Sequence, residues 1–535
     1  MVFLKPSNSG AFEPITLCED QSEITFYGWF RNNSGIFLQD PQFYGKNNNQ
    51  LATERTWFRG YVDYKISPQL RLWTAVEMAY EPWYPIESGA STSLSPIQEG
   101  KGIWKGSKEY SEYKNVNDIL REAYFEWRPS SLHSIRVGRQ IAIWGEALTT
   151  RIGDVIHPDN QRFTFAFANL EDTRIPAWMM RGIHDIPSIS SSFEWIVNPN
   201  LTQNRYRVSM SGSASAFGSP GGRFMPHPET RIDDLFSAHS VPINPIVAMM
   251  GGFSTDTIIH YPFSRDWVNV GDGTYAPMYA PSVREKYPSA WGDLRAGCRT
   301  TTTVAGYTFG ISYFHTQEYS PLTKYGRALS EPVIIPGVGI IPGVRDMVLV
   351  HPTKNIIGFY LNKQLPWPGV LRTEATYVPD QPFNTFALND HNAITRRDHI
   401  KYLIAYDLQS YFYPAWHKTA PFNVTIEHTG EILPNNDNIQ YAYYDTKMRT
   451  WTPTFTANIS TNWCYNLIST SVIGSFMPWG RSGLLMPIVT YTPPWRNESL
   501  SIEARYINIY GKNDYEGMGI LRDKDMLILT TQFNW

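Results

Sequence analysis

The chain has 535 residues, a formal net charge of -3 at pH 7 and a mean hydropathy of -0.33. It contains no run of about 18 apolar residues, which excludes an ordinary membrane-spanning helix, and its slight negative charge gives no argument for nucleic-acid binding. Aromatic residues make up 14% of the chain, with 18 Trp and 32 Tyr, as the interfacial girdles of a membrane β-barrel would require.

The three cysteines, Cys18, Cys298 and Cys464, form no CxxC pair, so the sequence indicates neither a zinc site nor a redox motif. We expect no cofactor and no metal, and a disulfide between any two of the three stays open. The N-terminal residues MVFLKPSNSG lack a basic stretch followed by an apolar core and are not a complete secretory signal. An exported barrel needs such a signal, and we expect it to be removed or replaced here. The alternative is a cytosolic protein that never carried one.

Residues 1–21 are expected to be irregular, in the periplasm or in a barrel lumen, and residues 22–535 to form one domain of paired strands. Within this domain, segments of strand length alternate apolar with polar residues, which places one set of side chains on each face of a sheet. Short turn-like sequences join the segments in pairs, one of them at Thr302 and Thr303. The predicted strands are 22–38, 54–66, 70–81, 122–128, 134–141, 174–184, 191–198, 289–301, 304–316, 354–365, 370–378, 398–413, 421–431, 450–459, 464–476, 484–491, 499–510 and 524–535.

Long connections alternate with the short turns along most of this domain. The long connections are 40–53, 82–118, 145–173, 199–288, 317–352 and 379–397. Outer-membrane barrels show this asymmetry, with short periplasmic turns and long extracellular loops. We therefore predict an all-β fold, a single transmembrane antiparallel β-barrel of about 18 strands with both termini in the periplasm. No sequence repeat of fixed period occurs, which argues against a propeller.

The hairpin around Pro129 indicates which way the two faces point. Phe125 and Trp127 alternate with Glu122 and Glu126. A soluble sheet hides its apolar face, whereas a membrane barrel turns that face to lipid and lines its lumen with polar groups. We predict that the two aromatic side chains face lipid and that the two carboxylates face the lumen.

The last strand carries the same pattern, with Leu529, Phe533 and Trp535 on one face. A terminal aromatic that closes an alternating strand resembles the signal read by the barrel-assembly machinery, although such signals most often end in Phe. We therefore expect that machinery as a partner, through the strand that ends at Trp535. The alternative is the edge strand of a soluble protein. Other expected partners are outer-membrane lipid, lipopolysaccharide and other outer-membrane proteins, and we expect no nucleic acid.

Three stretches resemble one protein family. They are GRQIAIWGE (138–146), GDVIHPDN (153–160) and LEDTRIPAWMMR (170–181). In this order they are similar to the GRQ strand end, WGE turn, D-x-x-x-P-x-D segment and R-x-P-x-W strand of the proteobacterial outer-membrane family known as domain of unknown function 1302. Weaker similarity runs from Glu23 to the C-terminus. The resemblance implies an outer-membrane β-barrel with loose links to alginate-export-type and porin-like channels, and it implies no particular substrate.

Polar residues on the two strands around Gly138 are the first candidate site. On the lipid face an Arg would cost roughly 2 to 4 kcal/mol at the midplane, so these residues should line a pore wall. They are Glu122, Glu126, Arg136, Arg139 and Gln140. Simple alternation places Arg139 on the outer face, so either a bulge at Gly138 turns it or it lies near an interface. Contact with substrate and a salt-bridge lattice that braces the wall are equally weighted alternatives.

The loop that opens at Trp144 is the second candidate. The family resemblance carries it through Asp154 and Asp159 into the barrel mouth, where inward loops narrow porin channels. The alternative is a loop anchor, in which Glu146 and Asp154 accept backbone hydrogen bonds beside a tight turn. The motif residues of this region are Trp144, Glu146, Asp154, Asp159, Arg174 and Trp178.

Catalysis has little support in the sequence. Asp390, His391 and His399 lie close together, but no serine occupies a nucleophile motif, so we predict no catalytic residue and no enzyme. The apolar segment PVIIPGVGIIPGV (332–344) is unusual for an outer loop and suggests contact with an apolar group. We predict a protein of the cell outer membrane that acts as a passive, porin-like channel for small solutes, hydrophobic or aromatic ones among them. The alternative is a loop-occluded structural barrel that serves as a subunit of a larger outer-membrane assembly.

Overall fold

The computed structural model describes the strands and many of their connections. The described residues are 3–4, 15–19, 22–38, 42–43, 46–47, 51–80, 119–145, 147, 151–158, 170–201, 240–242, 258–260, 267–269, 275–277, 283–286, 288–319, 322–328, 333–335, 339–341, 345–384, 394–411, 420–436, 449–494, 499–512, 517–522 and 525–535. Within these ranges, no helix is long and apolar enough to cross a membrane.

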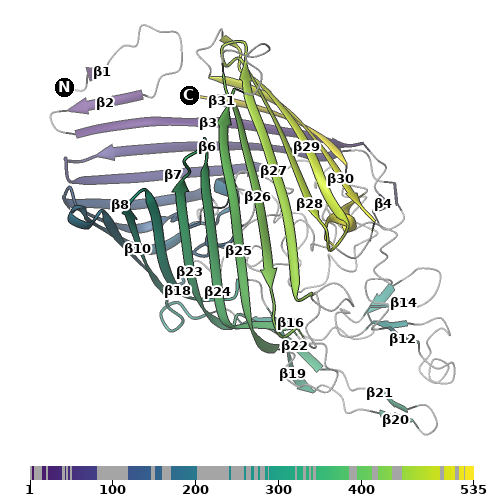
Figure 1. Ribbon diagram of the computed structural model, residues 1–535. Coiled ribbons are helices and arrows are strands. Elements are labelled where there is room, and N and C mark those ends of the chain that lie inside the picture. The colour runs from purple at the N-terminus through teal and green to yellow at the C-terminus, as the bar shows by residue number, and fades with distance from the viewer. Residues whose placement is uncertain are drawn as a thin grey trace.

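Antiparallel strands close into one barrel (Figure 1). The main sheet has twenty strands, of which β1 (Phe3–Leu4) and β2 (Ile15–Glu19) lie beyond the closure, leaving eighteen in the ring. In chain order the ring consists of β3 (Ser22–Phe37), β6 (Leu51–Lys65), β7 (Leu70–Tyr80), β8 (Leu120–Ser130), β9 (His133–Gln140), β10 (Ala177–Ile186), β11 (Ser191–Asn198), β17 (Arg295–Val304), β18 (Tyr307–Gln317), β23 (Thr353–Gln364), β24 (Val370–Asn384), β25 (Ile394–Ser410), β26 (Phe422–Ile432), β27 (Trp451–Trp463), β28 (Ile468–Met477), β29 (Ser482–Tyr491), β30 (Leu500–Gly511) and β31 (Met526–Asn534). The predicted all-β barrel of about 18 strands is confirmed.

The ring closes where β31 pairs with β3, in register from Trp29↔Asn534 to Phe37↔Met526. Beyond that ladder, Trp535 N–H donates to the Gly28 carbonyl at 2.9 Å, and Gly28 N–H donates to the Trp535 carbonyl at 2.8 Å. The first and last strands of the ring therefore satisfy each other's backbone groups, as a barrel in lipid requires.

Part of the segment before Ser22 differs from the expectation that it is irregular. β2 pairs with the start of β3, from Ile15↔Phe26 to Glu19↔Ser22, on the edge of β3 that β31 leaves unpaired. β1 pairs in turn with β2, and both lie outside the ring in Figure 1. An exposed strand edge attracts further pairing, and β2 covers this one.

The two ends of the barrel differ in the length of their connections. The periplasmic end carries short turns at 66–69, 131–132, 187–190, 305–306, 365–369 and 464–467. The extracellular end carries connections as long as 81–119, 199–294 and 318–352, although residues 478–481 join β28 to β29 with a short turn. The predicted asymmetry of short turns and long loops holds for most hairpins.

Short strands lie in the long extracellular connections; those labelled β12, β14 and β19 to β22 are low in Figure 1, and β4 is at its right edge. They are β4 (Gln42–Phe43), β5 (Lys46–Asn47), β12 (Ser240–Pro242), β13 (Ile258–His260), β14 (Trp267–Asn269), β15 (Tyr275–Pro277), β16 (Val283–Lys286), β19 (Leu322–Ala328), β20 (Val333–Ile335), β21 (Gly339–Ile341) and β22 (Arg345–Val350). β16 pairs in parallel with β22, which joins two of the long connections. Helical turns are α5 (Leu170–Thr173), η2 (Pro187–Ile189) and η7 (Gly517–Leu521).

The turn between β17 and β18 lies further along the chain than predicted. Thr302 and Thr303 continue β17, and the turn is made by Ala305 and Gly306, whose φ angles are 50° and 74°. Two-residue hairpins favour turns with positive φ at both positions, and Gly adopts such φ values without strain. The β-branched threonines instead favour an extended strand.

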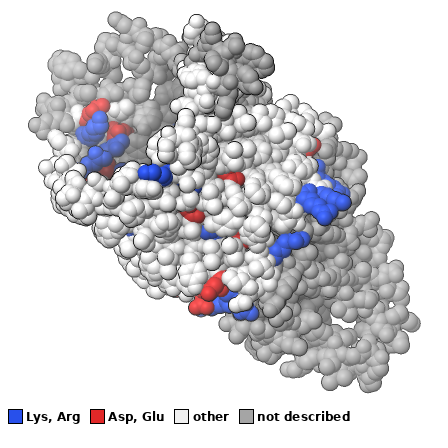
Figure 2. All heavy atoms as spheres, viewed as in Figure 1, with Lys and Arg blue, Asp and Glu red and all other residues white. Residues whose placement is uncertain are grey.

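Side chains alternate between an apolar outer face and a polar inner face. Phe125 and Trp127 are 53% and 50% exposed, whereas Glu126 between them is 1% exposed. Figure 2 shows one face of the molecule, on which the surface over the strands is largely free of charged side chains. This pattern is that of a barrel whose apolar side chains meet lipid.

β9 breaks the alternation at Gly138. Val137 is 47% exposed, but the next side chain, Arg139, is only 2% exposed. The register with β8 and β10 continues through Gly138 without a shift, and Gly138 has a φ of +142°. A glycine kink and not a bulge therefore removes Arg139 from the exposed outer face, where simple alternation would place it.

We expect Gly138→Ala to destabilise the barrel by about 1–3 kcal/mol, because a side chain at this φ is strained. A Cβ at Gly138 would also lie 2.2 Å from the Ala123 carbonyl oxygen. Urea unfolding in detergent micelles, followed by tryptophan fluorescence, measures the loss. The matched control is Gly474→Ala, where the nearest atom lies 3.9 Å from the added Cβ. Equal losses in the two variants would contradict the kink.

Candidate functional site

The connection between β9 and β10 enters the lumen. Its described residues, 141–145, 147, 151–158 and 170–176, are here called the strap. Residues of the strap contact strands on opposite sides of the ring. β24 is the ninth strand from β6 in either direction around the eighteen, and the strap reaches both.

The first anchor of the strap lies on β24 and β25. Ala147 N–H donates to Glu374 Oε2 at 3.2 Å. Gly153 lies so close to the same carboxylate that a Cβ there would be 2.2 Å from Glu374 Oε1. Ile152 packs against Leu403 and Ala405, which are each 1% exposed. This anchor therefore combines a polar contact with apolar packing.

An apolar cluster extends the same anchor to neighbouring strands. Trp144 and Ile156 of the strap are 3% and 0% exposed and pack with Phe314, Ile356 and Val378 of β18, β23 and β24. The Trp144 and Phe314 rings meet edge to face with their centroids 5.8 Å apart. Burial of such side chains removes apolar area from water at roughly 25 cal/mol per Å², so this end of the strap is held firmly.

The second anchor lies on β3 and β6. The Asp172 carboxylate accepts a hydrogen bond from Arg31 Nη1 at 2.7 Å and another from Arg59 Nη2 at 2.7 Å. Asp172 and Arg59 are both 4% exposed. Burial alone would raise the pKa of Asp172, but Arg59 and Arg31 outweigh it and hold that pKa below its ordinary value. Asp172 is therefore a charged contact at neutral pH.

Polar contacts within the strap hold residues 151–158 against residues 170–176. Arg174 Nε donates to Asp154 Oδ2 at 2.7 Å, and Arg151 Nε donates to the same oxygen at 3.2 Å. Arg151 Nη2 also donates to the carbonyl of His157, a residue that is 1% exposed.

His157 connects the start and the end of the strap. Its Nε2 accepts from Ala142 N–H at 2.8 Å, which leaves Nδ1–H to donate to the Ile175 carbonyl at 2.9 Å. Both bonds require a neutral ring with the proton on Nδ1. Burial lowers the pKa of His157 to about 3; Arg151 and Arg295 add to the lowering, and Asp154 opposes it. The ring therefore stays neutral over the ordinary pH range.

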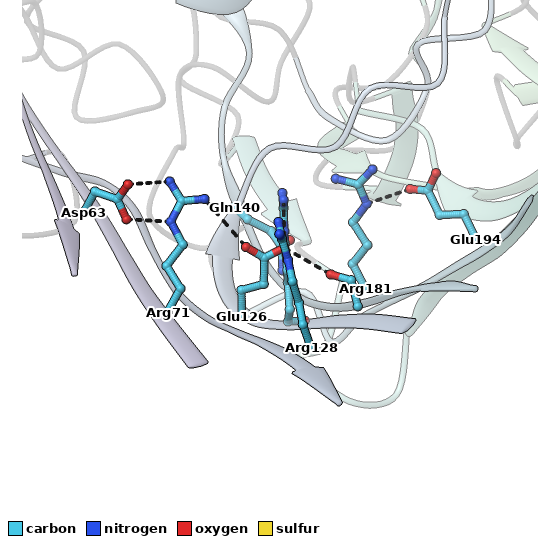
Figure 3. A network of polar contacts seen from close by, with 9 residues as sticks. Asp63, Arg71, Glu126, Arg128, Gln140, Arg181 and Glu194 are labelled. Atoms are coloured by element: carbon cyan, nitrogen blue, oxygen red, sulfur yellow. Dashed lines mark hydrogen bonds and ion pairs between the residues drawn. The ribbon is translucent and has the colours of Figure 1, made fainter. Parts of the chain in front are cut away.

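An Arg–carboxylate lattice covers the inner wall beside the strap, and Glu126 is its centre (Figure 3). Glu126 Oε1 accepts from Arg136 Nη2 at 3.1 Å and from Arg128 Nη2 at 3.0 Å. Arg71 Nη1 lies 3.7 Å from Glu126 Oε2 and the same guanidinium binds both oxygens of Asp63, at 2.5 and 2.7 Å. Three guanidinium groups thus surround one buried carboxylate, and the contacts fit a lattice that braces the wall.

Similar pairs recur further around the ring. Glu194 accepts from Arg181 Nε at 2.7 Å and from Arg299 Nη2 at 2.9 Å. Arg372 contacts Asp407, and its Nη2 lies 3.5 Å from Glu427 Oε1. Positive and negative side chains are therefore interleaved along the described part of the inner wall.

Nine of the eleven predicted site residues lie in the described chain. Glu122 accepts from Ile141 N–H at 3.1 Å and so holds the start of the strap. Gln140 is fully buried and donates to the Met179 carbonyl at 3.1 Å, and Trp178 is half-buried. The residues on the lattice or the strap are Glu126, Arg136, Trp144, Asp154 and Arg174. Glu146 and Asp159 lie outside the described residues, and a substrate contact by any of the eleven stays a prediction.

Sequence reasoning missed the contacts that anchor the strap. Asp172 lies within the family stretch LEDTRIPAWMMR, and Arg31 and Arg59 occupy alternating strand positions, but nothing in the sequence pairs them. His157 lies within the family stretch GDVIHPDN, but nothing in the sequence indicates its contacts, and Glu374 carried no signal. Among the described residues, no group of three or more His, Cys, Asp or Glu is placed to hold a metal ion. Asp390 and His391 lie outside the described residues, and Cys298 and Cys464 are free thiols.

The sequence matches the family described as "Protein of unknown function (DUF1302)" over residues 32–534. The chain belongs to this family. No curated protein matches the sequence. The resemblance found in the sequence is therefore confirmed for the family as a whole.

Solved structures with a similar fold are distant in sequence. OmpF of Salmonella typhi in complex with daunomycin shares 8% identity, with 97% of this chain and 100% of that chain covered and a TM-score of 0.38. The outer membrane channel DcaP of Acinetobacter baumannii shares 8% identity, with 97% of this chain and 99% of that chain covered and a TM-score of 0.38. OccAB4 of the same organism shares 8% identity, with 97% of this chain and 98% of that chain covered and a TM-score of 0.43. The pairing of this chain's own strands establishes the barrel, and the DUF1302 protein is a multi-pass β-barrel of the outer membrane.

We expect acid to loosen the strap through His157. The pKa of His157 is about 3 in the folded protein, against an ordinary 6.5. The neutral His157 ring therefore stabilises the docked strap fully above pH 6.5, and this stabilisation is lost as the pH falls from 6.5 toward 3. In that range the population of the open strap rises by up to about tenfold for each pH unit. Asp172 does not contribute in this window, because its pKa is lowered from an already acidic 3.8.

Hydrogen exchange of peptides from 141–158, corrected for intrinsic rates, measures the opening at pH 7.5 and pH 5. The expected rise in opening is on the order of thirtyfold. His157→Gln should remove the pH response, and His133→Gln, on the exposed periplasmic rim, should preserve it. A wild-type strap equally protected at both pH values would contradict this account.

Proposed function

We propose that the protein is a passive outer-membrane channel for small solutes, hydrophobic or aromatic ones among them. The observation that carries the proposal is the strap, which is anchored to opposite walls of the ring, by Glu374 on one side and by Arg31 and Arg59 on the other. Barrels of 16 to 18 strands are wide enough to leave an aqueous channel, and a segment that crosses the lumen narrows that channel.

Charged groups of both signs belong to the wall of the lumen. The Arg136 side chain is 24% exposed, whereas Glu126, which it contacts, is 1% exposed. Because positive and negative groups are interleaved, we propose weak ion selectivity.

We expect Arg136→Gln to shift the ion preference of the channel toward cations, by about twofold in the permeability ratio at low salt, because screening is least there. Glu126 keeps its contacts with Arg128 and Arg71, so the wall is preserved. Reversal potentials in planar bilayers under a potassium chloride gradient measure the shift. The matched control is Lys363→Gln, because Lys363 lies 3.6 Å from the centroid of the Tyr307 ring, which is 44% exposed at the periplasmic rim.

The second candidate function is a structural barrel in a larger outer-membrane assembly. The crossing of the lumen by the strap favours it, since a strap that fills the lumen would block solutes. Bilayer recordings and liposome swelling separate the two candidates. An absence of conductance in the wild type and in both variants would reject the channel and leave the structural barrel.

A further inference from the structure

The Asp172 carboxylate occupies a site that the barrel wall builds by itself. One of its oxygens is bound by Arg31 and the other by Arg59, each at 2.7 Å. The two guanidinium groups come from adjacent strands, β3 and β6, and the carboxylate bridges them. Asp172 alone comes from the strap, so the wall is the receptor and Asp172 is its occupant.

Wall residues hold both guanidinium groups in place without help from Asp172. Arg31 Nε donates to Gln532 at 2.7 Å, and Arg59 Nε donates to Glu77 at 2.6 Å. The Cζ atoms of the two arginines lie 4.3 and 4.6 Å from the Trp29 ring centroid. Stacking on an indole and hydrogen bonding at Nε fix each guanidinium. Arg31 Nη1 and Arg59 Nη2 are directed at the Asp172 carboxylate, and Arg59 Nη2 also contacts Glu77.

The charge of the cluster favours an anion in this place. Arg31, Arg59 and Arg121 carry three positive charges, and Glu77 and Asp172 carry two negative charges, with Glu77 Oε1 3.5 Å from Arg121 Nη1. These five groups sum to +1 with Asp172 docked and to +2 without it. An uncompensated buried charge is costly, so another anion is favoured wherever Asp172 leaves. A planar group with two oxygens matches the two N–H donors.

We propose that Arg31 and Arg59 form a binding site for the carboxylate of permeating organic solutes, and that Asp172 occupies this site as an internal competitor. The proposal deepens the channel function and rests on it. A solute carboxylate takes the place of Asp172 and frees the α5 end of the strap. The other end stays on the wall, because Glu374 and the packing of Ile152 do not depend on Asp172.

Calorimetric titration of the full-length barrel in detergent micelles with sodium benzoate tests the site. We expect Asp172→Ala to bind benzoate at least about tenfold more tightly than the wild type. In the wild type Asp172 occupies the site most of the time, so the apparent affinity for benzoate falls in proportion to the fraction of sites that are open. Asp172→Asn, which keeps the shape of the side chain, gives the same test if the alanine variant does not fold. No gain in either variant overturns the proposal.

Two further variants show where the gain arises. Adding Arg59→Gln to Asp172→Ala should remove the gain. Asp407→Ala is the matched control, because Asp407 is also a carboxylate on the inner wall that accepts from an arginine, Arg372, and it should leave benzoate affinity within twofold of the wild type. An equal gain in this control, or an equal gain for inorganic phosphate with Asp172→Ala, would overturn a specific carboxylate site.

Planar-bilayer recordings separate this proposal from the channel itself. Benzoate should carry more current relative to chloride in Asp172→Ala than in the wild type. If the barrel conducts but Asp172→Ala shows no gain in benzoate affinity by calorimetry, the channel function stands and the carboxylate site is rejected. Absence of conductance in every variant rejects the channel, and with it the role of the site in permeation.

Discussion

Backbone hydrogen bonding across the closure between β3 and β31 is the interaction on which the rest of the structure depends. In lipid no water is available for an unpaired N–H or C=O, so a membrane-spanning sheet must have no open edge. Gly28 and Trp535 complete the ladder, and a Cβ at Gly28 would lie 2.7 Å from the Trp535 ring. The ring of Trp535 stacks on Phe58, with the centroids 6.1 Å apart. The chain end is thereby fixed against the first strands, and β2 covers the edge that remains.

Closure of the ring turns the polar faces of the strands toward the lumen, and the charged side chains on these faces must then be paired. A charged side chain removed from water needs partners, and the wall supplies them as Arg–carboxylate groups centred on Glu126, Glu194 and Arg372. Several donors on one carboxylate fix side-chain positions more strongly than single exposed pairs, which contribute little. The strap uses the same chemistry at Asp172. One set of interactions therefore braces the wall and positions the segment that crosses it.

The sequence alone was sufficient for the barrel and its approximate strand number, because period-two alternation and the lengths of connections are local properties. The same local patterns gave wrong positions for side chains and turns where an unusual backbone conformation sets them. The φ of +142° at Gly138 redirects Arg139, and the positive φ values at Ala305 and Gly306 move a turn away from Thr302. The anchors of the strap were beyond sequence reasoning for a different reason. Asp172 lies 141 residues from Arg31 and 113 from Arg59, and only the closed ring brings them together.

The two anchors of the strap differ in what can disturb them. Ile152, Ile156 and Trp144 hold one end by apolar burial, which neither salt nor a polar solute displaces. The other end rests on charge-assisted hydrogen bonds from Arg31 and Arg59, and another carboxylate can replace those of Asp172. A segment held this way moves about its apolar end when the ionic end is released. The ionic anchor of the strap lies on the wall beside the closure, where Gln532 of the last strand positions Arg31.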